Sequence, residues 1–196
     1  MKIAILGFGK EGRSLLRFLK KSPEFKNSGV WVLDKDPRVK IPANVQSQLG
    51  KNYLSNLASF DIIFRTPGIR YHLPEIERAE RRGAKISSQI KLFFELCPTK
   101  HIIGVTGTKG KGTTSTLIYK ILKAAGKKAF LAGNIGLPAI EILPKLNKNY
   151  WVVLELSSFQ LIDATQSPHI AVILMVASEH MDWHANIKEY VDAKAN

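Results

Sequence analysis

Short apolar runs alternate along the chain with segments whose apolar residues recur at helical spacing. Lys2–Leu6 and Val30–Leu33 are typical of buried strands, and Arg13–Lys21 between them has the periodicity of an amphipathic helix. Further strands are expected at 61–65, 85–88, 101–105, 128–132, 151–156 and 170–176, and further helices at 74–82, 89–96, 113–125 and 187–195. This order predicts an α/β fold built on parallel sheets with right-handed crossovers.

The alternation of strands and helices restarts after Cys97-Pro98-Thr99, which interrupts the pattern. We therefore expect two domains: a Rossmann-like parallel-sheet domain at 1–97 and an α/β domain of the P-loop ATPase type at 98–196. The last expected helix reaches the end of the sequence with no cap and no closing strand. The second domain is accordingly expected to be incomplete.

A glycine-rich turn, Gly7-x-Gly9-x-x-Gly12, follows the first strand and opens the first helix, and Asp34 ends the next strand. This is the sequence context of a dinucleotide fingerprint, in which glycines let the backbone approach a pyrophosphate at the helix N-terminus. Asp34 would accept a hydrogen bond from a ribose hydroxyl or a base N–H. The motif does not distinguish NAD from a UDP-sugar, and glycines also serve tight packing of a strand on a helix.

A second glycine-rich loop lies between the strand at 101–105 and the helix at 113–125. Its backbone N–H groups would hold the phosphates of ATP, and Lys111 would pair with the β- and γ-phosphates. A Walker loop has Ser or Thr directly after this lysine, whereas this chain has Gly112, so Thr113 rather than Thr114 is expected to supply the magnesium-binding hydroxyl. The candidate ATP-binding residues are Gly107, Thr108, Lys109, Gly110, Lys111, Gly112, Thr113 and Thr114.

Three further side chains are candidates for the chemistry of this domain. Glu155 ends an apolar strand, where a carboxylate is costly unless it is paired or binds a metal. His180 follows the apolar run Ile170–Val176, expected to be a buried strand, and has Glu179 and Asp182 beside it. A lone histidine is more often structural than a ligand, and from the residues alone Lys194 is expected to be a solvated helix residue.

Composition and charge narrow the class of protein. The chain has 196 residues, 45% of them hydrophobic, and its single cysteine, Cys97, cannot form an intrachain disulfide, which fits a reducing compartment. The apolar N-terminal stretch is interrupted by glycines and charges, and no apolar run is long enough to span a bilayer. We expect a cytoplasmic monomer without membrane insertion. The net charge of +13 comes from scattered basic residues, which favours acidic small substrates over nucleic acid.

Four motifs together resemble the Mur ligases, in that family's order: Thr-Gly-Thr-Lys-Gly-Lys, Gly-Asn-Ile-Gly, Leu-Glu-Leu-Ser-Ser-Phe-Gln-Leu and His-Met-Asp-Trp-His. The resemblance covers the whole chain. It implies an N-terminal Rossmann-like domain that binds the UDP moiety and a central ATPase domain, here without its remainder and without the family's C-terminal domain. It also implies an ATP- and Mg²⁺-dependent ligase of peptidoglycan precursor synthesis that joins D-glutamate to UDP-N-acetylmuramoyl-L-alanine through an acyl phosphate. The chain alone would then be inactive.

The same resemblance implies the roles of individual residues. The catalytic residues would be Lys111, Asn134, His180 and Lys194. The magnesium ligands would be Thr113, Glu155, His180 and Lys194 as a carbamate, which turns a cationic amine into an anionic oxygen ligand. The residues toward the UDP-substrate would be Gly9, Lys10, Glu11, Gly12, Asp34, Lys35, Thr66 and Gly68. The D-glutamate site would belong to the missing domain.

Three alternatives remain open at the level of sequence. The Gly112 departure also resembles folylpolyglutamate synthases, although these lack an N-terminal Rossmann domain, and another Mur ligase would share most of the motifs. A non-catalytic nucleotide-sensing module with a degenerate phosphate loop belongs to a different class. Nucleotide binding without ATP turnover would distinguish that module from a ligase.

Overall fold

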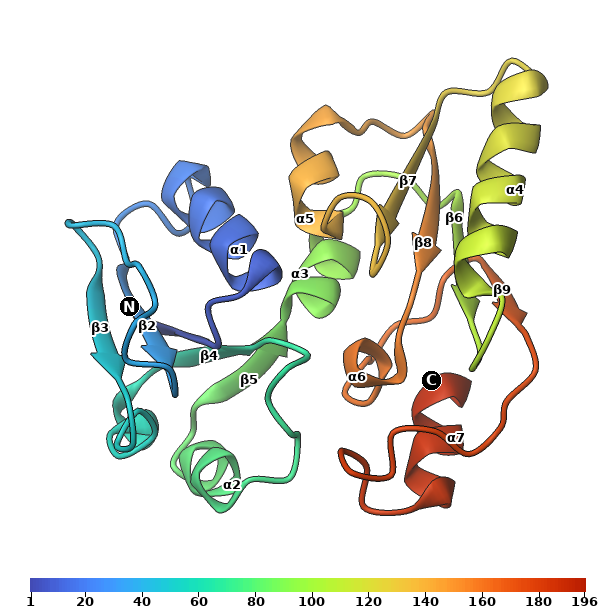
Figure 1. The fold of residues 1–196 in the computed structure, drawn as a ribbon. Helices are drawn as coiled ribbons and strands as arrows, with labels where there is room; N and C mark the ends of the chain where they lie inside the picture. The colour runs from blue at the N-terminus through green and yellow to red at the C-terminus, as the bar shows by residue number, and fades with distance from the viewer. The chain divides into compact units, whose positions relative to one another are not determined.

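The computed structural model describes residues 1–196, which divide into two compact units, Met1–Gln89 and Ile90–Asn196. Each unit contains one parallel β-sheet with helices packed on it (Figure 1). This architecture confirms the predicted α/β class with a Rossmann-like sheet. The division falls at the start of α3 (Gln89–Leu96), whereas the sequence places the domain boundary after Cys97, at the other end of that helix.

The first unit has five strands in the order β3-β2-β1-β4-β5, all parallel. The chain moves outward from β1 to β2 and β3 and then crosses to the other side of β1 to form β4 and β5. Ligands of such sheets bind at the carboxyl ends of the strands where the order reverses, here between β1 and β4. The strands are β1 (Lys2–Leu6), β2 (Gly29–Asp34), β3 (Gln46–Leu49), β4 (Ile62–Arg65) and β5 (Lys85–Ser88).

Helices cover both faces of this sheet. α1 (Lys10–Lys21) packs on the face of Ile5, because a side chain added at Gly12 would touch Ile5. α2 (Pro74–Arg81) and the short 3₁₀ helix η1 (Leu57–Ser59) pack on the opposite face, where Ile76 and Ala79 join a buried cluster with Ala4, Leu6 and Ile63. Successive strand residues point to opposite faces, so β1 contributes to both layers of the core.

The second unit has four parallel strands in the order β7-β8-β6-β9. α4 packs against β6, β7 and β8, while α6 contacts α7 near the carboxyl ends of the strands (Figure 1). The strands are β6 (Ile102–Thr106), β7 (Ala129–Gly133), β8 (Trp151–Glu155) and β9 (Ile170–Ile173). After α3, the helices are α4 (Lys111–Ala124), α5 (Ala139–Ile142), η2 (Leu143–Lys145), α6 (Ser158–Leu161) and α7 (Ile187–Ala195).

Two strands differ from the prediction. β3 was not expected, because Gln46-Ser47-Gln48-Leu49 lacks an apolar pattern. The strand lies at the exposed edge of the sheet, where its side chains do not need to be apolar. The run at 170–176 was expected to be a buried strand, but β9 ends at Ile173 and is mostly exposed, because it is the edge strand of the second sheet. None of the helices combines the length and the apolar composition needed to cross a bilayer.

Candidate nucleotide and metal site

The phosphate loop joins the carboxyl end of β6 to the start of α4. Gly107 has φ of 142° and Gly110 has φ of 83°, backbone conformations that favour glycine. A Cβ at Gly107 would lie 2.7 Å from the Cβ of Leu174, so this position is also closed to larger residues by packing. The Lys111 Nζ donates hydrogen bonds to the carbonyl oxygens of Gly107 and Thr108, both at 2.8 Å. The loop thus combines the glycine conformations, the helix N-terminus and the lysine that suit binding of phosphate groups.

Thr108 anchors this loop to α7 and to the segment after β9. Its Oγ1 accepts the Ala177 N–H at 2.9 Å, lies 3.0 Å from the Ala177 carbonyl oxygen and 2.7 Å from the Tyr190 hydroxyl. A threonine hydroxyl has one proton and two lone pairs. All three contacts are satisfied together when Thr108 donates to the Ala177 carbonyl and Tyr190 donates to Thr108. Tyr190 is buried, and sequence reasoning missed it, although it lies one helical turn before Lys194 on the same face of α7.

Glu155 lies at the carboxyl end of β8, beside the start of α4. Its side chain is buried, and its Oε1 accepts a hydrogen bond from Asn134 Nδ2 at 2.9 Å. A Cβ at Gly112 would lie 3.2 Å from its Oε2, so the glycine after Lys111 faces this carboxylate. The structure therefore brings together three candidates, Asn134, Glu155 and the phosphate loop. A buried carboxylate oxygen next to a phosphate loop fits Mg²⁺, which prefers oxygen ligands.

Lys194 is buried, in contrast to the solvated lysine expected from the residues alone. Its Nζ donates to the Gly107 carbonyl oxygen at 3.0 Å, the same oxygen that Lys111 contacts, and lies 4.6 Å from the centre of the Tyr190 ring. Burial, aided by the nearby Lys111 ammonium and opposed by the charge of Glu179, lowers the pKa of Lys194 to about 8. A lysine with this pKa has an appreciable fraction of free amine at neutral pH, the form that reacts with carbon dioxide to give a carbamate.

His180 lies in the turn between β9 and α7, and it is the one non-glycine residue with positive φ, at 60°. Its half-exposed ring lies 4.8 Å from the Phe159 ring and 3.6 Å from the Glu179 carboxylate. The structure contains no group of three or more His, Cys, Asp or Glu side chains placed to hold one metal ion. Of the expected magnesium ligands, Glu155 and Lys194 adjoin the phosphate loop, and the contacts of His180 are to its own turn and to α6. Thr113 is exposed on α4.

In the first unit, the glycine-rich turn lies at the point where the strand order reverses. Gly7 has φ of 89°, and a Cβ there would lie 2.2 Å from the Thr66 hydroxyl oxygen, while a Cβ at Gly12 would lie 2.3 Å from the Gly7 carbonyl oxygen. These two glycines therefore serve the tight packing of β1, α1 and the turn after β4. A Cβ at Gly9 would meet nothing within 4 Å, and Gly68 is equally open. Gly9 and Gly68 leave the backbone accessible, as ligand binding requires.

Asp34 ends β2 and contacts the backbone of two turns. Its Oδ2 accepts the Phe8 N–H at 2.7 Å and its Oδ1 accepts the Asp36 N–H at 2.9 Å. The carboxylate thus fixes the glycine-rich turn from the neighbouring strand. Each oxygen keeps a further lone pair, so this role is compatible with the expected contact to a ligand.

Among the other residues expected to bind the UDP-substrate, Thr66 is buried and donates its hydroxyl to the Leu6 carbonyl oxygen at 2.9 Å, whereas Lys10 and Lys35 are exposed.

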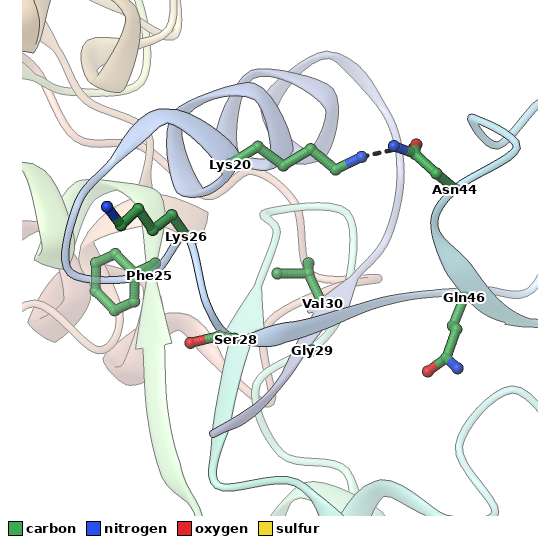
Figure 2. Close-up of a pocket in the computed structure, with 8 residues that line it drawn as sticks. All are labelled: Lys20, Phe25, Lys26, Ser28, Gly29, Val30, Asn44 and Gln46. Atoms are coloured by element: carbon green, nitrogen blue, oxygen red, sulfur yellow. Dashed lines mark hydrogen bonds between the residues drawn. The ribbon is translucent and has the colours of Figure 1, made fainter.

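An open pocket of about 350 Å³ lies at the opposite end of the first sheet, around the amino ends of β2 and β3 (Figure 2). Lys20 at the end of α1 donates to the Asn44 side chain at 2.9 Å across it. The polar side chains that line it are mostly exposed. The pocket contains none of the expected ligand-binding residues, which lie at the carboxyl ends of the strands.

Comparison with known families agrees with the division into two α/β units. Residues 1–88 match the family described as Mur ligase MurD-like, N-terminal domain, and residues 105–196 match the Mur ligase middle domain. An α/β chain with a reversal of strand order in one unit and a glycine-rich loop beside a buried carboxylate in the other fits this class. The chain belongs to the Mur ligase family.

The curated relatives with which we compared the chain all have the same enzyme name. UDP-N-acetylmuramoylalanine–D-glutamate ligases from Acetivibrio thermocellus, Symbiobacterium thermophilum and Clostridium botulinum are 42%, 44% and 39% identical to this chain over 98–100% of its length. The chain spans 42–43% of the length of these relatives. A solved structure of UDP-N-acetylmuramate:L-alanyl-gamma-D-glutamyl-meso-diaminopimelate ligase from Neisseria meningitides aligns with a TM-score of 0.53 at 18% identity, covering 98% of this chain and 65% of that one. This likeness supports the fold alone.

Proposed function

We propose that this chain forms the UDP-substrate and ATP sites of a cytoplasmic ligase that joins D-glutamate to UDP-N-acetylmuramoyl-L-alanine in peptidoglycan precursor synthesis. ATP would phosphorylate the alanine carboxylate, and the amine of D-glutamate would displace phosphate from the resulting acyl phosphate to form an amide. The family membership and the names of the relatives support this reaction. The observation that carries the proposal is the phosphate loop at the end of β6, with Lys111 in it and the buried Glu155 beside it.

The residues of the second unit have separate tasks in this proposal. Lys111 would exchange its two carbonyl partners for phosphate oxygens and offset charge on the transferred phosphoryl group. Glu155, His180, the carbamate of Lys194 and the hydroxyl of Thr113 would hold magnesium, which supplies charge neutralisation at the phosphates when bound. Asn134 orients the Glu155 carboxylate and would contact substrate and nucleotide. Positioning and electrostatic complementarity would provide most of the rate enhancement.

The first unit would bind the UDP group of the substrate at its switch point. The open backbone at Gly9 and Gly68 and the helix N-terminus of α1 support an anionic ligand there. Lys10, Glu11, Gly12, Asp34, Lys35 and Thr66 would complete this region.

A ligation assay tests the reaction on the protein that contains this chain. It should release phosphate from ATP only when both UDP-N-acetylmuramoyl-L-alanine and D-glutamate are present, and Lys111→Met should lower the rate by about 100-fold or more. Lys120→Met is the matched control, because Lys120 is an exposed lysine of α4 outside the phosphate loop. ATP binding without turnover would indicate a nucleotide-sensing module instead. Equal losses for the two lysine variants would contradict the role of Lys111.

Calorimetry tests the ligand of the first unit separately. UDP-N-acetylmuramoyl-L-alanine should bind and NAD should not, although the glycine-rich turn suits either pyrophosphate. Tight binding of NAD with no binding of the UDP compound would overturn this part of the proposal.

A further inference from the structure

The turn that carries His180 has an unusual backbone. His180 has φ of 60°, in the left-handed region, and its carbonyl oxygen accepts the N–H groups of Trp183 and His184, both at 3.0 Å. A non-glycine residue keeps such a conformation only where its surroundings hold it in place. The contacts that hold this turn therefore determine where the His180 ring points.

His184 provides two of these contacts. Its side chain is completely buried, with Nδ1 2.9 Å from Glu189 Oε1 and Nε2 2.9 Å from Ser158 Oγ. An ionised carboxylate only accepts hydrogen bonds, so Nδ1 donates to Glu189, and Nε2 is hydrogen-bonded to the Ser158 hydroxyl. Both ring nitrogens are thus used, one toward α7 and one toward α6. The imidazole joins the turn to two helices at once.

Ser158, the hydrogen-bond partner of His184 on α6, lies close in sequence to the candidate magnesium ligand Glu155. Ser158 is the first residue of α6, three positions after Glu155, and the helix start is fixed by a capping box between Ser157 and Gln160. The next residue, Phe159, packs its ring against His180 at 4.8 Å and against His184 at 5.6 Å. The His180 ring therefore rests on a helix that His184 binds through Ser158.

We propose that His184 is a positioning residue, which clamps the turn to α6 and so presents the left-handed His180 to the metal site. This inference rests on the proposed role of His180 as a magnesium ligand. His184 does not itself touch the metal; it acts through the backbone of the turn and through Phe159. The residues that the family resemblance assigns to the site do not include it.

Two conservative substitutions each remove one of the two hydrogen bonds that the His184 side chain makes. His184→Gln places an amide near the position of Nε2 and retains the contact with Ser158, whereas His184→Asn places one near Nδ1 and retains the contact with Glu189. Mn²⁺ binding, measured by electron paramagnetic resonance with a non-hydrolysable ATP analogue present, should weaken about 10-fold in both and further in His184→Ala. Ser158→Ala should resemble His184→Asn. Hydrogen exchange at the Trp183 and His184 amides should accelerate in every variant, with or without metal.

Two reference variants distinguish the clamp from general stability and from the metal assignment. Thr99→Val removes buried hydrogen bonds of the second unit away from this turn, at 2.8 Å to the Tyr150 carbonyl oxygen and 3.0 Å from the His101 N–H, and should leave Mn²⁺ affinity unchanged. An equal loss in Thr99→Val would overturn the inference. If His180→Gln weakens Mn²⁺ binding while the His184 variants do not, the inference fails and the proposed function stands. If His180→Gln has no effect, its metal role fails. Unchanged exchange of the two amides overturns the clamp in either case.

Discussion

The ammonium groups of Lys111 and Lys194 both donate a hydrogen bond to the carbonyl oxygen of Gly107. Charging the buried amine of Lys194 costs free energy in the folded protein, which is why its pKa falls to about 8. In the unfolded chain the pKa returns to about 10.4. Between these values the unfolded state binds more protons, so the free energy of unfolding rises as pH increases through this window.

We therefore expect the stability of the protein relative to Lys194→Met to increase between pH 8 and pH 10 by about 1–3 kcal/mol. Urea unfolding in buffers free of carbon dioxide measures this difference without interference from carbamate formation. Lys120→Met, at an exposed position of α4, is the control and should show no such window. A flat difference for Lys194→Met across the window would mean that the amine is not destabilised by burial.

The glycines of the first turn provide a second test at single residues. Gly12→Ala would drive a methyl group into the Gly7 carbonyl oxygen and should destabilise the protein by about 1–3 kcal/mol. Gly9→Ala has open space and should change stability by less than about 0.5 kcal/mol. It should nevertheless weaken binding of UDP-N-acetylmuramoyl-L-alanine if the backbone approaches the pyrophosphate there. Urea titration and calorimetry measure the two effects, and equal destabilisation by both substitutions would contradict the packing argument.

Single residues also show what the sequence could and could not predict about the site. The positions of the phosphate loop and Glu155 follow from the apolar strands that precede them, because the carboxyl ends of parallel strands meet at one edge. The burial of Lys194 and the hydrogen bonds of His184 do not follow from such a pattern. They depend on how α7 packs against the loop and against α6, and these are contacts between segments far apart in the chain.

At the scale of elements, strongly periodic segments were predicted well and short ones were missed. α3 and α7 begin and end where the sequence predicts. α5 and α6 have four residues each, too few for a period to be visible, and α6 depends on the capping box at Ser157. β3 is polar because it lies at an edge, and β9 is apolar although it is exposed.

The exposed apolar residues of β9 make this edge prone to association. Ile173→Lys, at a side chain that is 56% exposed, should reduce aggregation of the 196-residue chain while changing its stability by less than about 0.5 kcal/mol. Light scattering during thermal unfolding measures the aggregation, and urea titration measures the change in the free energy of unfolding. Ile173→Val keeps the apolar edge and should aggregate like the unchanged chain. Equal aggregation of the lysine variant would show that association proceeds through another surface.

At the scale of the whole molecule, the two compact units should respond to different ligands. UDP should slow hydrogen exchange mainly within residues 1–89, and a non-hydrolysable ATP analogue mainly within residues 90–196. At a ligand concentration of 100 times Kd the stabilisation is about 2.7 kcal/mol, which corresponds to roughly 100-fold slower exchange of the most protected amides. Exchange measured by mass spectrometry locates the effect. Protection of both units by either ligand would mean that they unfold together.

The carbonyl oxygen shared by Lys111 and Lys194 also has a consequence for chemical reactivity. With a pKa of about 8, about a tenth of the Lys194 side chains are unprotonated at pH 7, far more than for an ordinary lysine. Such an amine is a nucleophile toward aldehydes and activated esters, and reagents of this kind that also bear a phosphate group would be attracted by the neighbouring Lys111. The pair of the half-buried Lys111 and the buried Lys194 therefore makes the phosphate loop a place where a covalent, lysine-directed inhibitor could gain selectivity over the many surface lysines of this basic chain.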